Sequence, residues 1–142
     1  MPLLNYTTKI APDKTVGEIQ SILGKKGVKS VSIEYEKSRP AAVLFVIKVG
    51  NNDVQFRLPC NVEGVLTAMR NDRKIPGSSK NFDQAERTAW RIVKDWVEAQ
   101  LAIIEAGQAL MEEVFMPYAV NPRTGQTFFQ SFTEDAQKLL TE

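Results

Sequence analysis

Cationic residues gather in a loop near the middle of the chain and in the helical segment that follows it. The loop also contains the run Pro76-Gly77-Ser78-Ser79, whose small residues offer free backbone amides just before a predicted helix. Such amides and clustered cations both favour anions, phosphate above all. The candidate ligands of a phosphate or a nucleic acid are Arg70, Arg73, Lys74, Lys80, Arg87, Arg91 and Lys94, with Arg57 on the polar face of a predicted strand.

Trp90 lies among Arg87, Arg91 and Lys94 in the sequence and could stack on a base, as aromatic side chains do in proteins that bind single strands. The chain has no GxxxxGK[ST] phosphate loop, no GxGxxG motif after a strand and no RNP-type aromatic motif. The cations therefore identify no particular nucleotide or nucleic acid. A solvated loop of this composition could also serve solubility alone.

The chain contains no histidine and a single cysteine, Cys60. Ser–His and Cys–His nucleophile pairs cannot be formed, and the commonest zinc ligands are missing. Neighbouring carboxylates, such as Glu34 with Glu36 and Glu112 with Glu113, match no cation-binding loop and are typical of solvated faces. We therefore predict a protein without metal, cofactor or catalytic residue, which acts by binding. Cys60 is expected to be a small buried apolar side chain.

With 142 residues, 43% of them hydrophobic, the chain has the size of one domain. Its formal net charge of +1 gives no long-range attraction to DNA or to membranes. The first residues lack the basic and apolar regions of a signal peptide, and the longest apolar run, residues 41–47, is too short to span a bilayer. We expect a cytoplasmic protein of a bacterium or a phage-infected cell.

Alternating apolar residues predict four strands in the first half of the chain. These strands cover residues 4–10, 31–35, 42–49 and 54–58. A capping box between Thr15 and Glu18 predicts the start of a short helix, and Asn61 can cap a second one. The elements indicate an α+β fold with an antiparallel four-stranded sheet packed by helices, in the order β-α-β-β-β-α. We expect a single domain, 1–142.

The second half of the chain has the 3.6-residue period of one long C-terminal amphipathic helix over residues 82–118, which separates the sheet-forming half (1–70) from a C-terminal tail (119–142). Gly107 would either pack closely against another backbone or interrupt the helix. The predicted core face comprises Ala85, Ala89, Ile92, Trp96, Ile103, Leu110 and Val114.

Cations occupy the first half of the polar ridge of this helix and carboxylates the second half, the reverse of what the helix dipole favours. In an antiparallel pair of such helices, Arg87 would meet Glu112 and Lys94 would meet Glu105, each twice by symmetry. A helix of about 50 Å would also overhang a domain of roughly 40 Å diameter. We therefore hypothesise a homodimer or higher oligomer, with a monomer as the alternative. The predicted interface residues are Trp90, Val97, Leu101, Glu105 and Glu112.

Several segments resemble an uncharacterised family of small proteins from phages and related mobile elements. The resemblance rests on FRLP at residues 56–59, AWRIVKDWVEAQLAIIEAG at 89–107, EVFMPY at 113–118 and TGQTFF at 124–129, with NYTTKI and KTVGEIQ near the start. It covers nearly the whole chain. The resemblance implies a setting and no activity, and it assigns no catalytic or binding residue.

Two functions fit these observations. The first is a nucleic-acid-binding accessory protein of a phage that uses the cations around Trp90, with single strands as one candidate ligand. The second is an anti-defence protein that sequesters a nucleotide signal, with the same cations around its phosphates, or that binds a host factor. Salt separates nucleic acid from nucleotide, because counterion release makes strand binding steeply salt-dependent. An enzyme that relies on carboxylates alone is the third and least supported function.

Overall fold

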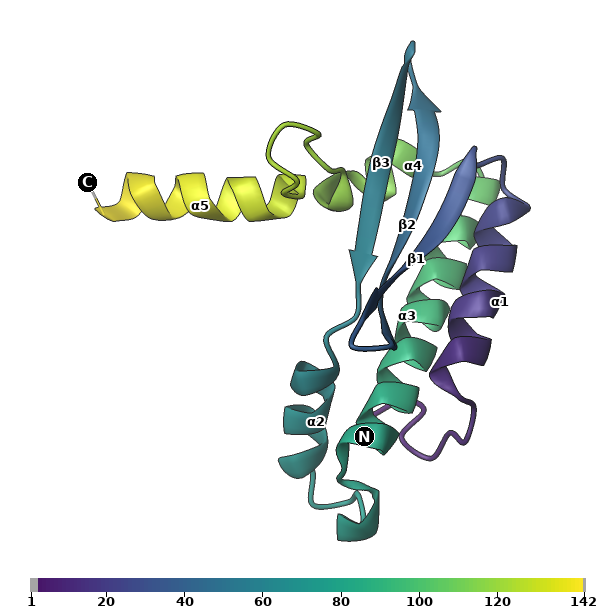
Figure 1. The fold of residues 1–142 in the computed structure, drawn as a ribbon, viewed down its shortest axis with the longest axis vertical. Helices are drawn as coiled ribbons and strands as arrows, with labels where there is room; N and C mark the ends of the chain where they lie inside the picture. Colours follow the sequence, from purple (N-terminus) through teal and green to yellow (C-terminus); the bar gives the residue numbers. More distant parts are fainter. Residues whose placement is uncertain (1–2, 142) are drawn as a thin grey trace.

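A three-stranded antiparallel sheet in the order β1-β2-β3 forms the centre of the computed structural model, which describes residues 3–141 (Figure 1). The α+β class is confirmed, but the prediction of four strands is wrong. The strands are β1 (Ser30–Glu36), β2 (Arg39–Val49) and β3 (Asn52–Pro59). The helices are α1 (Pro12–Gly24), α2 (Val62–Arg70), α3 (Phe82–Glu105), α4 (Met111–Val114) and α5 (Phe128–Thr141), with single 3₁₀ turns η1 (Gly77–Ser79) and η2 (Met116–Tyr118).

Strands β2 and β3 form a hairpin whose two inner phenylalanines fix its position on the core. Phe45 lies opposite Phe56 in the register, and the two rings stack with centroids 5.2 Å apart. Gly50 adopts a φ of 62° in the turn between the strands, a conformation that glycine takes without steric cost. The alternation of apolar residues therefore predicted this half of the sheet correctly.

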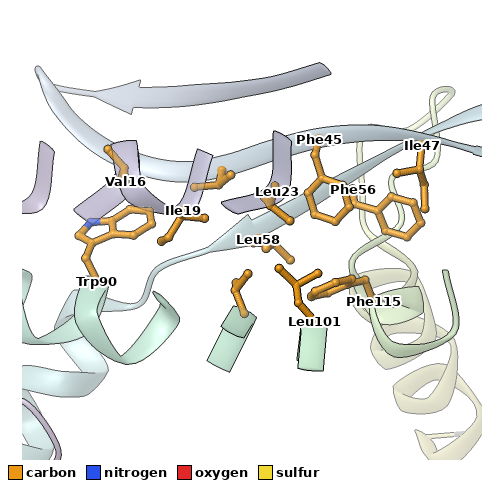
Figure 2. Close-up of a cluster of buried hydrophobic side chains, with 12 residues drawn as sticks. Val16, Ile19, Leu23, Phe45, Ile47, Phe56, Leu58, Trp90, Leu101 and Phe115 are labelled. Atoms are coloured by element: carbon orange, nitrogen blue, oxygen red, sulfur yellow. The ribbon is translucent and has the colours of Figure 1, made fainter. Parts of the chain in front are cut away.

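Helices α1 and α3 lie side by side and cover one face of the sheet (Figure 1). Their buried side chains meet those of β2 and β3 in one core, drawn in Figure 2. The buried members of this main core are Val16, Ile19, Leu23, Val43, Phe45, Ile47, Phe56, Leu58, Trp90, Val97, Leu101 and Phe115. One sheet face is therefore apolar and covered, while the other carries polar side chains such as Ser32 and Arg57.

The segment expected to form the first strand, residues 4–10, is an irregular segment that begins with a turn. Asn5 adopts a left-handed φ of 65°, and Thr8 donates its backbone N–H to the Asn5 carbonyl at 3.0 Å. The carbonyls of Tyr6 and Thr8 accept hydrogen bonds from the Gln84 side-chain amide, at 2.8 and 2.9 Å. A side chain of α3 thus satisfies backbone groups that a neighbouring strand would otherwise pair with.

The first helix begins one turn earlier than the predicted capping box, at Pro12. Proline suits the first helical position, because its missing N–H would be unpaired there and its φ is already helical. Thr15 consequently lies inside the helix. Its side chain is buried and accepts a hydrogen bond from Arg91 at 3.3 Å.

The predicted long helix over 82–118 is also wrong, because α3 ends at Glu105. Gly107 has a φ of 75° and donates to the Ile104 carbonyl at 3.0 Å, and Gln108 donates to the Ile103 carbonyl at 3.1 Å. This pair of hydrogen bonds is a Schellman motif, in which a left-handed glycine closes the helix. The chain then turns through α4 and η2, which return Phe115 to the main core.

A second, smaller core fixes α2 and the loop after it against the start of α3. Leu66, Met69, Ile75 and Ala85 are buried there, with Leu3 and Tyr6 of the N-terminal segment packed against them. Asn61 caps α2 as predicted, since its Oδ1 accepts from the Gly64 N–H at 2.9 Å.

The segment after η2 pairs briefly with the free edge of β3 before the chain enters α5. Val120 donates its N–H to the Gln55 carbonyl at 2.8 Å. A capping box between Thr127 and Gln130 opens α5, through hydrogen bonds of 2.8 and 3.3 Å. Beyond this start, α5 extends away from the sheet and the other helices (Figure 1).

Candidate functional site

Arg87, Arg91 and Lys94 of α3 all make contacts within the chain, and the last two face α1. Arg91 donates to Glu18 Oε2 at 2.9 Å, and Lys94 Nζ lies 3.7 Å from the same oxygen and also pairs with Glu98. The side chains of Arg91 and Lys94 are only 15% and 14% exposed. Arg87 donates to Gln84 Oε1 at 2.6 and 3.1 Å. Arg91 and Lys94 therefore lie in the contact between α1 and α3, and Arg87 is held by a neighbouring side chain of α3.

The order of the charged residues along α3 is explained by the opposite charges that they meet on and just after α1. Glu18, near the middle of α1, pairs with Arg91 of α3. Lys26, just after the C-terminal end of α1, lies 3.0 Å from Glu105, the last residue of α3. The two helices therefore run parallel, and the cations and carboxylates of α3 meet opposite charges in the same order. The ridge was predicted to pair with a second copy of the chain, whereas the contacts of Arg91 and Glu105 are with α1 and the residues after it in the same chain.

The hydrogen bond from Arg91 holds the pKa of the Glu18 carboxyl below its ordinary value, and the charges of Arg91 and Lys94 act in the same direction. Partial burial opposes this effect without cancelling it. In the folded protein, the Glu18 carboxyl is therefore ionised near neutral pH.

The predicted oligomer interface on α3 is wrong, because its apolar members belong to the main core. Trp90 and Val97 have no exposed surface, and Leu101 is 3% exposed. Trp90 therefore has no free face on which a base could stack. Glu105 pairs with Lys26, and Glu112 belongs to α4, beyond the end of α3, so the antiparallel pairing of Arg87 with Glu112 has no continuous helix to support it.

The predicted core face of this segment is correct at its start, where Ala85 and Ala89 are buried, but not further along. Ile103 is 37% exposed and Leu110 is 62% exposed, whereas Trp90 is fully buried. Trp96 is half-buried, and its ring packs edge-on against Phe115, with centroids 5.5 Å apart. The helix thus has apolar side chains on more than one face, because α1, the sheet and the segment around Phe115 all pack on it.

The loop cations, in contrast, stay available. Arg70, Arg73 and Lys74 are exposed and Lys80 is half-buried, and none of the four has an ion pair within residues 3–141. We name these four side chains the basic tip, because α2 and η1 form one end of the molecule (Figure 1).

The backbone that carries the basic tip is fixed in place. Ile75, in the middle of the loop, is 2% exposed and packs into the second core. Asp72, the one carboxylate between Arg70 and Lys80, accepts the Lys74 N–H at 2.9 Å through its Oδ1. The tip is therefore a structured projection with an excess of positive charge.

Arg57, the remaining predicted ligand, lines a groove of about 660 Å³ between the end of the sheet and the start of α3. Its guanidinium binds Glu34 across β2 through hydrogen bonds of 2.7 and 3.4 Å. This bond holds the pKa of the Glu34 carboxyl below its ordinary value. This ion pair lies on the polar face of the sheet and crosses β2 close to Ala42, the residue of β2 that lies opposite Glu34.

Sequence reasoning missed the ion pair between Arg39 and Glu86, which also lies in this groove. Arg39 donates to Glu86 at 3.0 Å and to Asp83 at 3.5 Å, and its guanidinium lies 4.8 Å from the centre of the Phe82 ring. Glu86 is 7% exposed, so its charge depends on Arg39 for compensation. Glu86 stands between Ala85 and Arg87 in the sequence, and this position does not identify its partner.

Cys60 also lines the groove, but it is no nucleophile. Burial raises the pKa of its thiol to about 12, and the charge of Glu86 acts in the same direction. The thiolate, which is the reactive form, is therefore nearly absent near neutral pH. The prediction of a small buried apolar side chain is therefore correct only in part, because Cys60 packs on the main core but is half-buried.

No three Cys, Asp or Glu side chains within residues 3–141 come together as metal ligands would. No helix there has the length and apolar character needed to cross a membrane.

Comparisons with models of protein families, with curated proteins and with solved structures find no match to this chain. The resemblance to phage and mobile-element proteins therefore stays a prediction.

Proposed function

We propose that this protein is a non-enzymatic nucleic-acid-binding accessory protein that contacts the phosphate backbone through the basic tip. The observation that carries the proposal is that Arg70, Arg73, Lys74 and Lys80 have no ion pair within the described residues. They lie at the end of α2 and in the loop after it, which Ile75 anchors. Ordered cations at an exposed end suit a long polyanion better than a small enclosed ligand. The setting we propose, from the sequence resemblance, is the cytoplasm of a bacterium or a phage-infected cell.

The role of the tip is limited to backbone contact. Lysine and arginine bound to phosphates confer affinity and position but no sequence preference. Trp90 is buried, so its ring has no free face for stacking on a base and takes no part in the proposed binding. Binding would therefore be largely independent of sequence and strongly dependent on salt.

The test is fluorescence anisotropy with a labelled 20-nucleotide oligothymidine, a matched RNA and a duplex, between 50 and 200 mM salt. Four phosphate contacts to a single strand give a slope of log K against log salt of about −3, or roughly a 50-fold loss over this range. Replacement of two tip cations in Arg73→Gln/Lys74→Gln should reduce the slope to about −1.4.

A matched control is Lys25→Gln/Lys48→Gln, which removes the same charge from exposed lysines that have no ion pair within residues 3–141. The control should bind as the natural chain does. An equal loss in the control, or no binding by the natural chain at 50 mM salt, would show that the tip is not a nucleic-acid site. Arg91 is unsuitable for this test, because its removal would disturb the contact with Glu18.

A second candidate, sequestration of a nucleotide, is favoured by the groove. Its volume suits a small ligand, and Lys37, Arg39 and Arg57 lie on its wall. Carboxylates already hold both arginines in place, so a bound phosphate would meet positioned donors. Thermal-shift titration with mono- and dinucleotides would detect such binding. Arg57→Gln should abolish the shift, and Lys26→Gln, which breaks another ion pair, should not.

A further inference from the structure

We propose that α5 is a dimerisation arm, whose apolar stripe packs against the α5 helix of a second copy of this chain. At about 100° per residue, the apolar side chains of α5 fall within a stripe roughly 120° wide. Phe128, Phe129 and Phe132 are 51%, 58% and 61% exposed, and Leu140 is 88% exposed. Gln130 and Glu134 lie on the opposite side of the helix.

Among the described residues, α5 packs mainly on η2, through the start of the helix. Phe128 donates its N–H to the Ala119 carbonyl at 2.8 Å, and the start of the helix packs on η2. The remaining turns extend from the body without covering any surface of it (Figure 1). A helix of 14 residues is marginal in water, because most helical stability in proteins comes from packing of the apolar face. The stripe therefore requires a surface to cover it.

The exposed apolar area is enough for a symmetric dimer. A phenylalanine side chain contributes roughly 200 Å², so the three rings expose on the order of 350 Å² together. With Leu140 and with Met116 on η2, which is 51% exposed, each protomer offers about 600 Å². Specific interfaces bury about 600–1,000 Å² per partner. A two-fold dimer meets this need with one patch, since the same patch serves both partners.

The charge of α5 argues against the other surfaces that an amphipathic helix could cover. Helices that lie on anionic membranes carry several lysines and arginines on their polar face. The polar residues of α5 include two carboxylates, Glu134 and Asp135, and one cation, Lys138. This composition gives no attraction to anionic lipids or to nucleic acid. The remaining surface that could cover the stripe is an apolar protein surface, and the same stripe on a second copy of the chain is such a surface.

The experiment is sedimentation velocity and light scattering of the natural chain between 1 and 200 µM. We expect a concentration-dependent mass that rises from 15.9 kDa to twice that value. Phe132→Glu, in the middle of the stripe, should weaken the dimer at least tenfold. Gln130→Glu is the matched control: it adds the same charge on the opposite side, and glutamate also preserves the capping box with Thr127.

Each outcome decides the proposal. A natural chain that stays monomeric at 200 µM, or a dimer that Phe132→Glu leaves intact, would overturn it. Binding of the monomer to anionic vesicles that Phe132→Glu abolishes would overturn it in favour of a membrane surface. Because α5 lies outside the main core, the variant should keep the thermal midpoint of the control at low concentration. Should Phe132→Glu fail to fold, Phe129→Glu applies the same test one turn earlier.

Discussion

Glu18 lies between two cations of α3, and its ionisation helps to hold α1 in place. Its pKa is lower in the folded protein than in the unfolded chain, where a glutamate titrates near 4.5. The contribution to stability is therefore fully present above pH 4.5 and is lost as the pH falls through the lowered folded value.

We expect Glu18→Gln to reduce the free energy of unfolding by about 1 kcal/mol at pH 7, since the pair is partly exposed. The difference from the natural chain should shrink below pH 4.5 and disappear once the pH lies below the lowered pKa of Glu18 in the folded protein. Urea unfolding at several pH values measures this difference. Glu36→Gln, at an exposed glutamate without an ion pair in the described region, should show no such convergence. A difference that stays constant with pH would mean that packing, and not charge, is lost in Glu18→Gln.

Cys60 provides a second prediction at the scale of one residue. With the pKa of the thiol at about 12, the thiolate fraction at pH 8 is smaller than that of a free cysteine by more than two orders of magnitude. Native protein should therefore react with a disulfide reagent at least 100-fold more slowly than unfolded protein does. A variant with an added exposed cysteine, Lys25→Cys, supplies the fast reference within one chain. Rapid modification of Cys60 in the native state would contradict its burial.

At the scale of elements, local patterns predicted β2, β3 and α2 because each of these elements carries its own signals. The alternation around Phe45 and Phe56 indicates strands, the residues at Gly50 indicate a hairpin turn, and Asn61 indicates a helix start. In residues 4–10 the same alternation was misleading. There, the contacts that decide the conformation come from Gln84, far along the chain, and a sequence pattern does not show them.

The faces of α3 could not be assigned from its period for a related reason. Trp90 packs beside Val16 and Ile19 of α1, whereas Trp96 packs on Phe115, on another side of the helix (Figure 2). A helix that is covered from several directions carries apolar residues on several faces, and the period alone cannot rank them. The groove was missed because Arg39 and Glu86 come from separate elements that only the fold brings together.

The end of α3 depends on Gly107 in a way that substitution can measure. An added Cβ at Gly107 or at Gly17 would meet no atom within 4 Å, so the two positions differ mainly in backbone conformation. Gly107→Ala should cost about 1 kcal/mol, because alanine disfavours a φ of 75°. Gly17→Ala, within α1, should instead stabilise by about 0.5–1 kcal/mol. Thermal and urea unfolding measure both. If Gly107→Ala were neutral, the Schellman motif would not be what ends α3.

At the scale of the whole molecule, the two cores divide the chain into regions of unequal stability. The main core joins the sheet, α1, α3 and Phe115, whereas the second core has four buried residues and fixes α2, the loop and the N-terminal segment. Local opening follows the least-packed regions of a structure. We therefore expect α2 and the basic tip to open while the sheet remains folded.

Ile75→Ala tests this division and its consequence for function. Loss of a buried isoleucine side chain costs about 2–4 kcal/mol, and here the cost should fall on the second core. Hydrogen exchange should show faster exchange in α2 and unchanged protection in β2. Oligonucleotide affinity should also fall, although no charge is altered, because the backbone beneath Lys74 loses its anchor. Ile103→Ala, at a residue 37% exposed on α3, is the control and should change neither quantity by more than a small factor. Equal losses of protection in α2 and β2 would instead indicate that the two cores unfold as one cooperative unit, with the basic tip as stable as the sheet.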